Sequence, residues 1–280
     1  MKKILITGSS GYIGKHIVSE LTKHNFEIYC IDRNPPTQNS KIKYMKGDIF
    51  KLPIQTYSKL GKFDICLHLA WQDGFNHASS SHLKNWFSHY LFLTKLIEHG
   101  IKHITVLGSM HEVGYWHGPV NEHTPTNPLS YYALAKNSLR QALEIYLIGK
   151  KIIFQWVRGF YIYGDDIENQ SLFTRITQME IKGEKYFPFT SGLNKYDFIH
   201  IDEFSKQICA TVSQNVINGI INCSSGKAIS LKKKVSEFLR ENRYKIKPKF
   251  GAFQSRSYDS PAIWGDVTKI NKIMKLNKEC

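Results

Sequence analysis

The chain has 280 residues and a formal net charge of +15, with 42% hydrophobic and 22% charged residues. These values are typical of a globular protein and exclude a disordered or fibrous one. No apolar run reaches the roughly 18 residues that a membrane-spanning helix needs, and the first residues lead straight into the strand-like Ile4-Leu5-Ile6. We therefore expect a cytoplasmic protein without a signal peptide or a membrane partner.

Cysteine and charge patterns exclude two further classes of protein. The five cysteines are widely spaced and form no Cys-x-x-Cys pair, and the histidines show no zinc-ligand spacing, so we expect reduced thiols and no metal. The positive charge comes mostly from scattered lysines without a basic-aromatic motif, which favours a solvated surface over nucleic acid binding. A basic surface also suits a substrate that carries a diphosphate.

Strand-like apolar runs alternate with helical patterns through the first 165 residues. Strands are predicted at Lys3-Ile6, Glu27-Ile31, Ile42-Lys46, Ile65-Leu69, His103-Leu107 and Ile152-Arg158, and helices at Gly11-His24, Leu83-His99 and Ser130-Leu147. This rhythm predicts an α/β fold with a doubly wound, mainly parallel sheet of the Rossmann type. After Tyr163-Gly164 the elements become shorter. We expect a dinucleotide-binding domain over residues 1–164 and a smaller substrate lobe over 165–280, with one segment of the lobe returning to the sheet.

A glycine-rich turn follows the first predicted strand. Residues 7–14 read Thr-Gly-Ser-Ser-Gly-Tyr-Ile-Gly and open the first helix, where a pyrophosphate can meet a helix N-terminus. The residues expected to contact a dinucleotide there are Gly8, Ser10, Gly11, Tyr12, Ile13 and Gly14. A glycine triplet alone is weak evidence, but its place between a strand and a helix makes it strong.

Residues at the ends of later strands extend this expected cofactor site. Asp32 ends the second strand, 18 residues beyond Gly14, and its carboxylate suits the ribose hydroxyls of NAD. Arg33 follows immediately and suits the 2′-phosphate of NADP. The choice between the two cofactors therefore stays open, although Asp32 favours NAD. Asp48 follows the third strand and is either an adenine ligand, with Ile49 beside it, or a turn former. Leu69 and Ala70 end the fourth strand at the edge where ligands of such sheets lie.

Tyr132 and Lys136 stand one helical turn apart on the same face of a predicted helix. An ammonium stabilises a tyrosinate and lowers the pKa of the phenol, so Tyr132 can exchange a proton with a sugar hydroxyl or ketone. Such pairs also occur by chance on ordinary helices. Downstream of the glycine-rich turn, however, the pair indicates a catalytic site.

In this combination the chain resembles an extended short-chain dehydrogenase/reductase of the NAD-dependent epimerase/dehydratase family. The matching segments, in order, are residues 7–14, Asp32, Gly47-Asp48, His68-Leu69-Ala70, Tyr132 with Lys136, Arg158 with Tyr163-Gly164, residues 197–202 and residues 265–269. The resemblance implies a nucleotide-diphosphate sugar as substrate. It also implies that Arg256 meets the nucleotide, the alternative being an ordinary surface arginine, and that Trp71 lies near the substrate.

The segment after the fifth strand departs from the family pattern. It reads Ser109-Met110-His111-Glu112-Val113-Gly114, where relatives place a hydroxyl residue that binds the reacting oxygen at the position of Met110. Either Ser109 serves instead, which we favour, or another group such as His111 or Glu112 does; Met110 and His111 are then expected beside the substrate. His111 also replaces the acid that sugar 4,6-dehydratases use, which disfavours a dehydratase. His89 replaces an asparagine of relatives, and Tyr196 stands where they often have arginine.

Three functions remain open on these grounds. The preferred one is an NAD(P)H-dependent reductase of a nucleotide-linked 4-keto-6-deoxyhexose, such as a dTDP sugar, with Tyr132 as proton donor to the C4 oxygen, Lys136 holding the ribose and Ser109 binding the same oxygen. The alternative is a nucleotide-sugar 4-epimerase with bound NAD. A dinucleotide sensor without catalysis is the third. The resemblance further implies a homodimer formed by the helices near 83–99 and 130–147. The candidate residues, for which burial against the chain's own sheet is an equally compatible alternative, are Trp86, Tyr90, Leu139, Leu143 and Tyr146.

Overall fold

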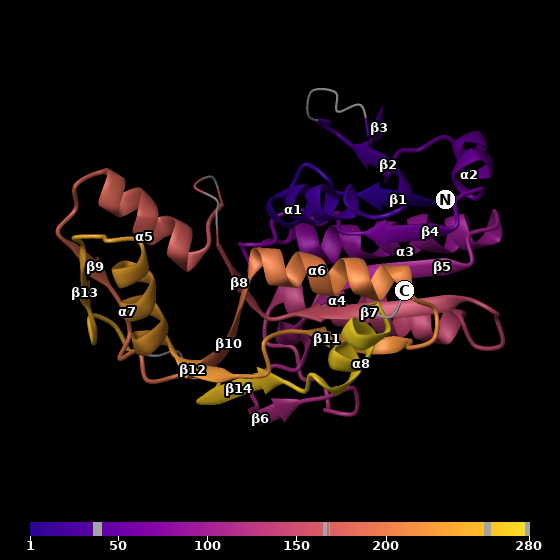
Figure 1. Cartoon of the computed structure of the whole chain (residues 1–280). Helices are drawn as coiled ribbons and strands as arrows, with labels where there is room; N and C mark the ends of the chain where they lie inside the picture. The colour runs from indigo at the N-terminus through magenta and orange to yellow at the C-terminus, as the bar shows by residue number, and fades with distance from the viewer. Residues whose placement is uncertain (36–40, 165–166, 168, 255–258, 278–280) are drawn as a thin grey trace.

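A computed structural model describes residues 1–35, 41–164, 167, 169–254 and 259–277. Its centre is a seven-stranded sheet in the order β11-β7-β5-β4-β1-β2-β3, in which every neighbouring pair is parallel (Figure 1). The strands are β1 (Lys2–Thr7), β2 (Phe26–Asp32), β3 (Ile42–Lys46), β4 (Ile65–His68), β5 (His103–Ser109), β7 (Ile153–Gly159) and β11 (Gly219–Cys223). The predicted Rossmann-type fold is thus confirmed.

Helices cover both faces of this sheet, as the continuous apolar strands require. One face packs on α1 (Tyr12–Leu21), α6 (Ile201–Ser213) and α8 (Thr268–Leu276). The other packs on α2 (Ile54–Leu60), α3 (Ser81–Glu98) and α4 (Tyr131–Tyr146). The short helix α2 was not predicted, because its seven residues show too little periodicity to separate it from a loop.

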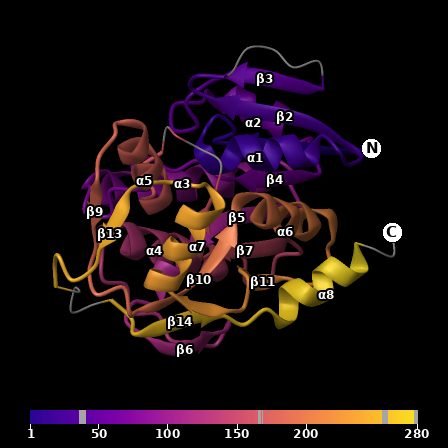
Figure 2. The ribbon, with the colours of Figure 1, turned by 60° about the vertical axis from the view of Figure 1, so that its left-hand side comes forward.

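A smaller lobe lies beside the sheet, with α5 (Leu172–Ile181) and α7 (Leu231–Glu241) next to each other in both views (Figures 1 and 2). A second sheet runs β12 (Ala228–Ser230), β10 (Lys195–His200), β14 (Ala262–Gly265) and β6 (His117–Val120), and β8 (Tyr161–Tyr163) pairs with β10. The strands β9 (Tyr186–Pro188) and β13 (Lys247–Lys249) form a two-stranded ribbon. No helix of the described residues is long and apolar enough to cross a membrane.

The chain changes sheets repeatedly. β6 comes from the first half of the sequence but pairs with β14 in the second sheet, while β11, α6 and α8 follow residue 165 and complete the large sheet and its cover. The cleft between the two sheets is therefore lined by residues from distant parts of the sequence.

Asp197 on β10 ties the two sheets together. Its buried carboxylate accepts hydrogen bonds from Ser225 N at 2.8 Å, Ser225 Oγ at 2.6 Å, Gly226 N at 2.9 Å and Gly265 N at 3.0 Å. Ser225 and Gly226 follow β11 of the large sheet, and Gly265 ends β14. One carboxylate thus joins β10 to the segment after β11 and to the end of β14, and without it the amide of Gly265 would be buried without this acceptor.

We predict that Asp197→Ala lowers the free energy of unfolding by about 3 kcal/mol, because four donors, among them the buried amide of Gly265, lose their acceptor. Urea unfolding followed by circular dichroism measures this change. Asp202→Ala, which removes a carboxylate with 61% of its side chain exposed, is the matched control and should cost less than about 1 kcal/mol. Equal losses in the two variants would contradict the role given to Asp197.

Candidate active site

The glycine-rich turn between β1 and α1 forms the floor of the main cleft. Gly8 has φ +74°, and a Cβ there would lie 2.6 Å from Ala70 Cα; a Cβ at Gly14 would lie 2.1 Å from Gly8 O. Gly11 caps α1 without a side-chain hydrogen bond, so no side chain of the cap competes for the first amides of the helix. These features fit the pyrophosphate of a dinucleotide. Gly8, Gly11, Tyr12, Ile13 and Gly14 line the main cleft.

A second cavity of about 190 Å³ lies beyond the turn, at the end of β2. Ser10, Asp32, Arg33, Asp48, Ile49, Leu69 and Ala70 all line it. Asp32 accepts the amide of Ser10 at 2.9 Å and the hydroxyl of Ser9 at 3.4 Å, so the same carboxylate braces the glycine-rich turn and faces the space for an adenosine. The residues present therefore fit a dinucleotide.

Asp48 forms a turn at the end of β3, and its position beside the second cavity leaves the expected adenine contact open. Its Oδ1 accepts the amide of Phe50 at 3.0 Å, as a turn-forming aspartate does, and the residue also borders the cavity. The side chain of Arg33 is exposed beside Asp32, at the mouth of the same cavity.

Tyr132 and Lys136 on α4 meet Ser109, the last residue of β5, in the main cleft of about 700 Å³. Desolvation raises the pKa of Tyr132 to about 12, and a hydrogen bond with Ser109 works against that rise. Lys136 is buried; its Nζ donates to Leu107 O at 2.6 Å and lies 3.8 Å from the ring centre of Trp71. Burial lowers the pKa of Lys136 to about 7, although the negative charge of Glu112 opposes this shift.

Ser109, at the end of β5, and the two residues that follow it lie in different surroundings. Ser109 faces the cleft, and its Oγ accepts the amide of His111 at 3.2 Å. Met110 is buried in a small apolar cluster with Val113 and Phe160, and borders a third cavity rather than the main cleft. His111 lines the main cleft, where burial lowers its pKa to about 3 and keeps the imidazole neutral.

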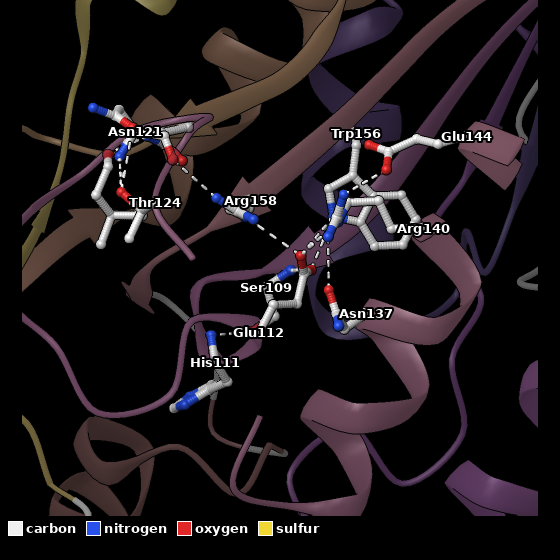
Figure 3. A network of polar contacts seen from close by, with 12 residues as sticks. Ser109, His111, Glu112, Asn121, Thr124, Asn137, Arg140, Glu144, Trp156 and Arg158 are labelled. Carbon is white, nitrogen blue, oxygen red and sulfur yellow. Dashed lines mark hydrogen bonds and ion pairs between the residues drawn. The ribbon is translucent and has the colours of Figure 1, made fainter. Parts of the chain in front are cut away.

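Glu112 is not among the residues that line the main cleft and lies in a buried polar network (Figure 3). Its Oε1 accepts the amide of Ser109 at 2.7 Å and the indole N–H of Trp156 at 2.9 Å. Its Oε2 accepts from Arg158 Nε at 3.3 Å and lies 3.6 Å from Arg140 Nε. A carboxylate engaged in this way has no access to a substrate, so Ser109 and His111, which both line the main cleft, are the candidates that remain for binding the reacting oxygen.

The rings of three other residues surround the ring of Tyr132, and the sequence did not predict this arrangement. The ring of His77 stacks on the phenol with centroids 4.5 Å apart and planes 8° apart, and the rings of His82 and Trp71 meet it edge-on. His77 lies on the loop after β4, far from α4 in sequence, and no motif marks it. Phe75 of the same loop also lines the cleft.

Trp71 lies between the cavity at the end of β2 and the main cleft that contains Tyr132. It borders both cavities, stacks on His89 with centroids 4.5 Å apart, and donates from Nε1 to His82 Nδ1 at 3.0 Å. His89 Nδ1 and His68 Nε2 are joined by a hydrogen bond of 2.9 Å, and burial lowers the pKa of both imidazoles. The expectation for Arg256 falls outside the described residues.

We predict that Lys136→Met changes the pH dependence of stability. The pKa of Lys136 falls from 10.5 in the unfolded chain to about 7 in the folded protein. Between pH 7 and 10.5 the unfolded chain therefore binds more protons than the folded protein. The free energy of unfolding consequently rises with pH in this range. Between pH 7 and 9.5 the free energy of unfolding of the wild type should therefore rise by about 1 to 4 kcal/mol relative to that of the variant, as measured by urea unfolding. Lys84→Met, at an exposed position of α3, should show no such slope; parallel pH profiles for Lys136→Met and wild type would refute the prediction.

A Rossmann-type sheet with a tyrosine and a lysine one turn apart beside the glycine-rich turn defines a dehydrogenase/reductase of the short-chain type. The family model described as the NAD dependent epimerase/dehydratase family matches residues 4–224. The chain belongs to this family.

Three relatives illustrate the similarity. A dTDP-6-deoxy-L-talose 4-dehydrogenase (NAD(+)) of Aggregatibacter actinomycetemcomitans is 45% identical over 267 residues, which cover 94% of this chain and 98% of that protein. The structure of a UDP-N-acetylglucosamine 4-epimerase from Methanobrevibacter ruminantium superposes with a TM-score of 0.84 at 21% identity, covering 97% of this chain and 91% of its own. That of UDP-glucuronic acid 4-epimerase from Bacillus cereus, in complex with UDP-glucuronic acid and NAD, gives 0.83 at 21% identity, covering 98% and 93%.

Proposed function

We propose that the protein interconverts the C4 alcohol and the C4 ketone of a dTDP-linked 6-deoxyhexose with NAD as the hydride carrier. The observation that carries this proposal is the meeting of Ser109, Tyr132 and Lys136 in one cleft that also reaches the glycine-rich turn. The 45% identity with a dTDP-6-deoxy-L-talose 4-dehydrogenase supports both the sugar class and the position of the reaction. A 4-dehydrogenase and a 4-ketoreductase catalyse one reaction in opposite directions, so the reductase expected from the sequence is included.

Tyr132 acts at the C4 oxygen. In the reducing direction its phenol, protonated at neutral pH because burial raises its pKa, donates a proton as the alkoxide forms. Ser109 donates a hydrogen bond to the same oxygen and limits the charge that develops there. When bound, the nicotinamide supplies or accepts the hydride at C4. Lys136 holds its ammonium against Trp71 and Leu107 O, one turn along the helix from Tyr132.

The position of Glu112 argues against water elimination. Sugar dehydratases of the resembled type use an acid and a glutamate at positions 111 and 112, whereas here His111 is neutral and Glu112 is bonded to Trp156 and Arg158 in the interior. Glu112 is therefore held in the interior, and His111 does not supply the carboxylic acid that such an elimination uses. Hydride transfer at C4 needs neither of them.

NAD is the proposed cofactor rather than NADP. The carboxylate of Asp32 borders the adenosine cavity and would repel a 2′-phosphate. The name of the 45% identical relative also specifies NAD(+).

We further propose that the protein forms a homodimer through α3 and α4. Leu139 and Leu143 are buried against the large sheet and are not available for this surface. The apolar residues that these helices leave exposed are Leu83, Phe87, Leu91, Leu134 and Ile145.

We predict that the purified protein oxidises NADH, with a strong preference over NADPH, when given a dTDP-4-keto-6-deoxyhexose, and reduces NAD when given dTDP-6-deoxy-L-talose. Absorbance at 340 nm measures both directions. Tyr132→Phe should lose about 10²- to 10⁴-fold in kcat, the usual loss on removing a positioned proton donor, while its affinity for NAD stays unchanged. Tyr131→Phe, which alters the exposed neighbouring phenol, is the matched control.

Two outcomes would overturn the proposal. Full activity of Tyr132→Phe would remove the proton donor from the mechanism. Absence of turnover with either dTDP sugar, together with C4 inversion of a UDP-hexose detected by proton NMR, would establish the epimerase alternative instead.

A further inference from the structure

The ring of His77, on the loop between β4 and α3, lies flat on the phenol of Tyr132. The two planes are 8° apart and the centroids 4.5 Å apart, whereas the other rings that contact the phenol within the described part of the chain meet it at 70° to 90°. A ring packed flat on one face prevents the phenol from swinging about its Cα–Cβ bond toward that side. His77 therefore limits the rotamers that are open to Tyr132.

A backbone hydrogen bond joins the same two residues. The amide of Tyr132 donates to the carbonyl oxygen of His77 at 3.1 Å. Tyr132 is the second residue of α4, so its amide is one of the first four of the helix, which have no acceptor within the helix. Ser130 Oγ accepts the next of these amides, that of Ala133, at 3.2 Å. The loop and the N-terminus of α4 are therefore joined at one point by main chain and side chain together.

The loop is braced by polar contacts of its own. Asp73 Oδ2 accepts from the hydroxyls of Ser81 at 2.7 Å and Ser79 at 2.8 Å, and these two hydrogen bonds lower the pKa of the carboxyl. The backbone of Asp73 has φ +56°, a left-handed conformation that aspartate tolerates. His82 Nε2 donates to the carbonyl oxygen of Asn76 at 2.8 Å. These contacts restrain the backbone on both sides of the stacked histidine.

A second ring contacts the imidazole of His77. His111, which follows β5, meets it edge-on with centroids 4.6 Å apart and planes at 71°. His111 in turn meets the ring of Tyr161 at 6.0 Å. His77 is thus held from two elements, from α4 through Tyr132 and from the segment after β5 through His111.

The place of the phenol decides whether it can transfer a proton. Its hydroxyl must lie within hydrogen-bond reach of the C4 oxygen that Ser109 is proposed to bind as well. The hydroxyl is the atom of the side chain farthest from the backbone, so a small swing about the Cα–Cβ bond displaces it more than any ring atom. A displacement of about 1 Å at a reacting group can cost about 100-fold in rate.

We propose that His77 is a positioning residue for the reaction at C4, and that its ring and its carbonyl oxygen together hold the hydroxyl of Tyr132 in place. This inference rests on the proposed function, since it concerns the proton donor of that reaction. His77 is not among the described residues that border the second cavity, where the adenosine is expected. The affinity for NAD should therefore depend little on it.

Steady-state kinetics of His77→Ala with NADH and a dTDP-4-keto-6-deoxyhexose tests this role. We expect kcat to fall about 10- to 100-fold because the hydroxyl is displaced, while KM for the sugar and Kd for NAD change by less than about threefold. His77→Phe keeps a flat ring and the carbonyl oxygen, so it should retain at least about a third of the wild-type kcat. His117→Ala removes an exposed histidine of β6 and is the matched control, with wild-type kinetics.

Two kinetic results would overturn the inference. A rise in KM without a fall in kcat in His77→Ala would show that the imidazole binds the sugar instead. Equal losses of kcat in His77→Phe and His77→Ala would show that the imidazole acts through its own chemistry rather than by holding the phenol.

Asp73→Ala tests the same role from outside the cleft, since Asp73 is not among the described residues that line the three cavities. The variant removes the acceptor of two loop hydroxyls and places alanine at φ +56°, which loosens the loop. It should lower kcat at unchanged KM. The double variant with His77→Ala should lose no more than the stronger single variant, because both act through one contact; additive losses would contradict the inference.

Crystal structures of the wild type and His77→Ala without ligands separate failure of this inference from failure of the proposed function. If the wild type turns over neither dTDP sugar, the proposed function fails, but the place of the phenol can still be compared. In His77→Ala the hydroxyl of Tyr132 should move by at least about 1 Å relative to Ser109, or occupy two positions. An ordered phenol in the wild-type position would overturn the inference whatever the substrate is.

Discussion

The buried carboxylate of Glu112 is the constraint on which the reacting side of the cleft depends. It joins the segment after β5 to β7 through Trp156 and Arg158, and to α4 through Arg140. Ser109, whose amide it accepts, is thereby fixed relative to the helix that carries Tyr132. Removal of one member of such a buried ion group leaves an uncompensated charge and is strongly destabilising. Glu112 thus holds Ser109, the residue proposed to bind the reacting oxygen, in place beside Tyr132.

The main cleft combines an apolar environment with few charges, and this sets the protonation states of its groups. The pKa of Tyr132 rises and that of Lys136 falls because both lose water, not because of their mutual influence. The rings of His77, His82 and Trp71 pack around Tyr132, and the ring of Trp71 also lies against the ammonium of Lys136. The lysine therefore stands close to its own titration point near neutral pH, which makes it responsive to any charge that enters the cleft.

The sequence predicted the parts of the fold that local patterns encode. Strands such as Ile4-Leu5-Ile6 are continuous apolar runs because both faces of a parallel sheet are covered, and the glycine-rich turn follows from backbone geometry at Gly8 and Gly14. The sequence did not predict the pairing of β6 with β14 or the stacking of His77 on Tyr132, since both join segments far apart in the chain. For the same reason, composition alone could not distinguish the internal role of Glu112 from a catalytic one.

The return of the chain to its first sheet has a consequence for biosynthesis. α1, which presents the glycine-rich turn, packs on α6, and α6 packs in turn on α8 near the end of the chain. Until residues 201–276 have been synthesised, α1 is the one helix of the three that covers this face of the growing sheet. The nascent chain therefore exposes apolar surface until α6 and α8 have been made, and chaperone demand should be set by these two late helices rather than by the early Rossmann segments.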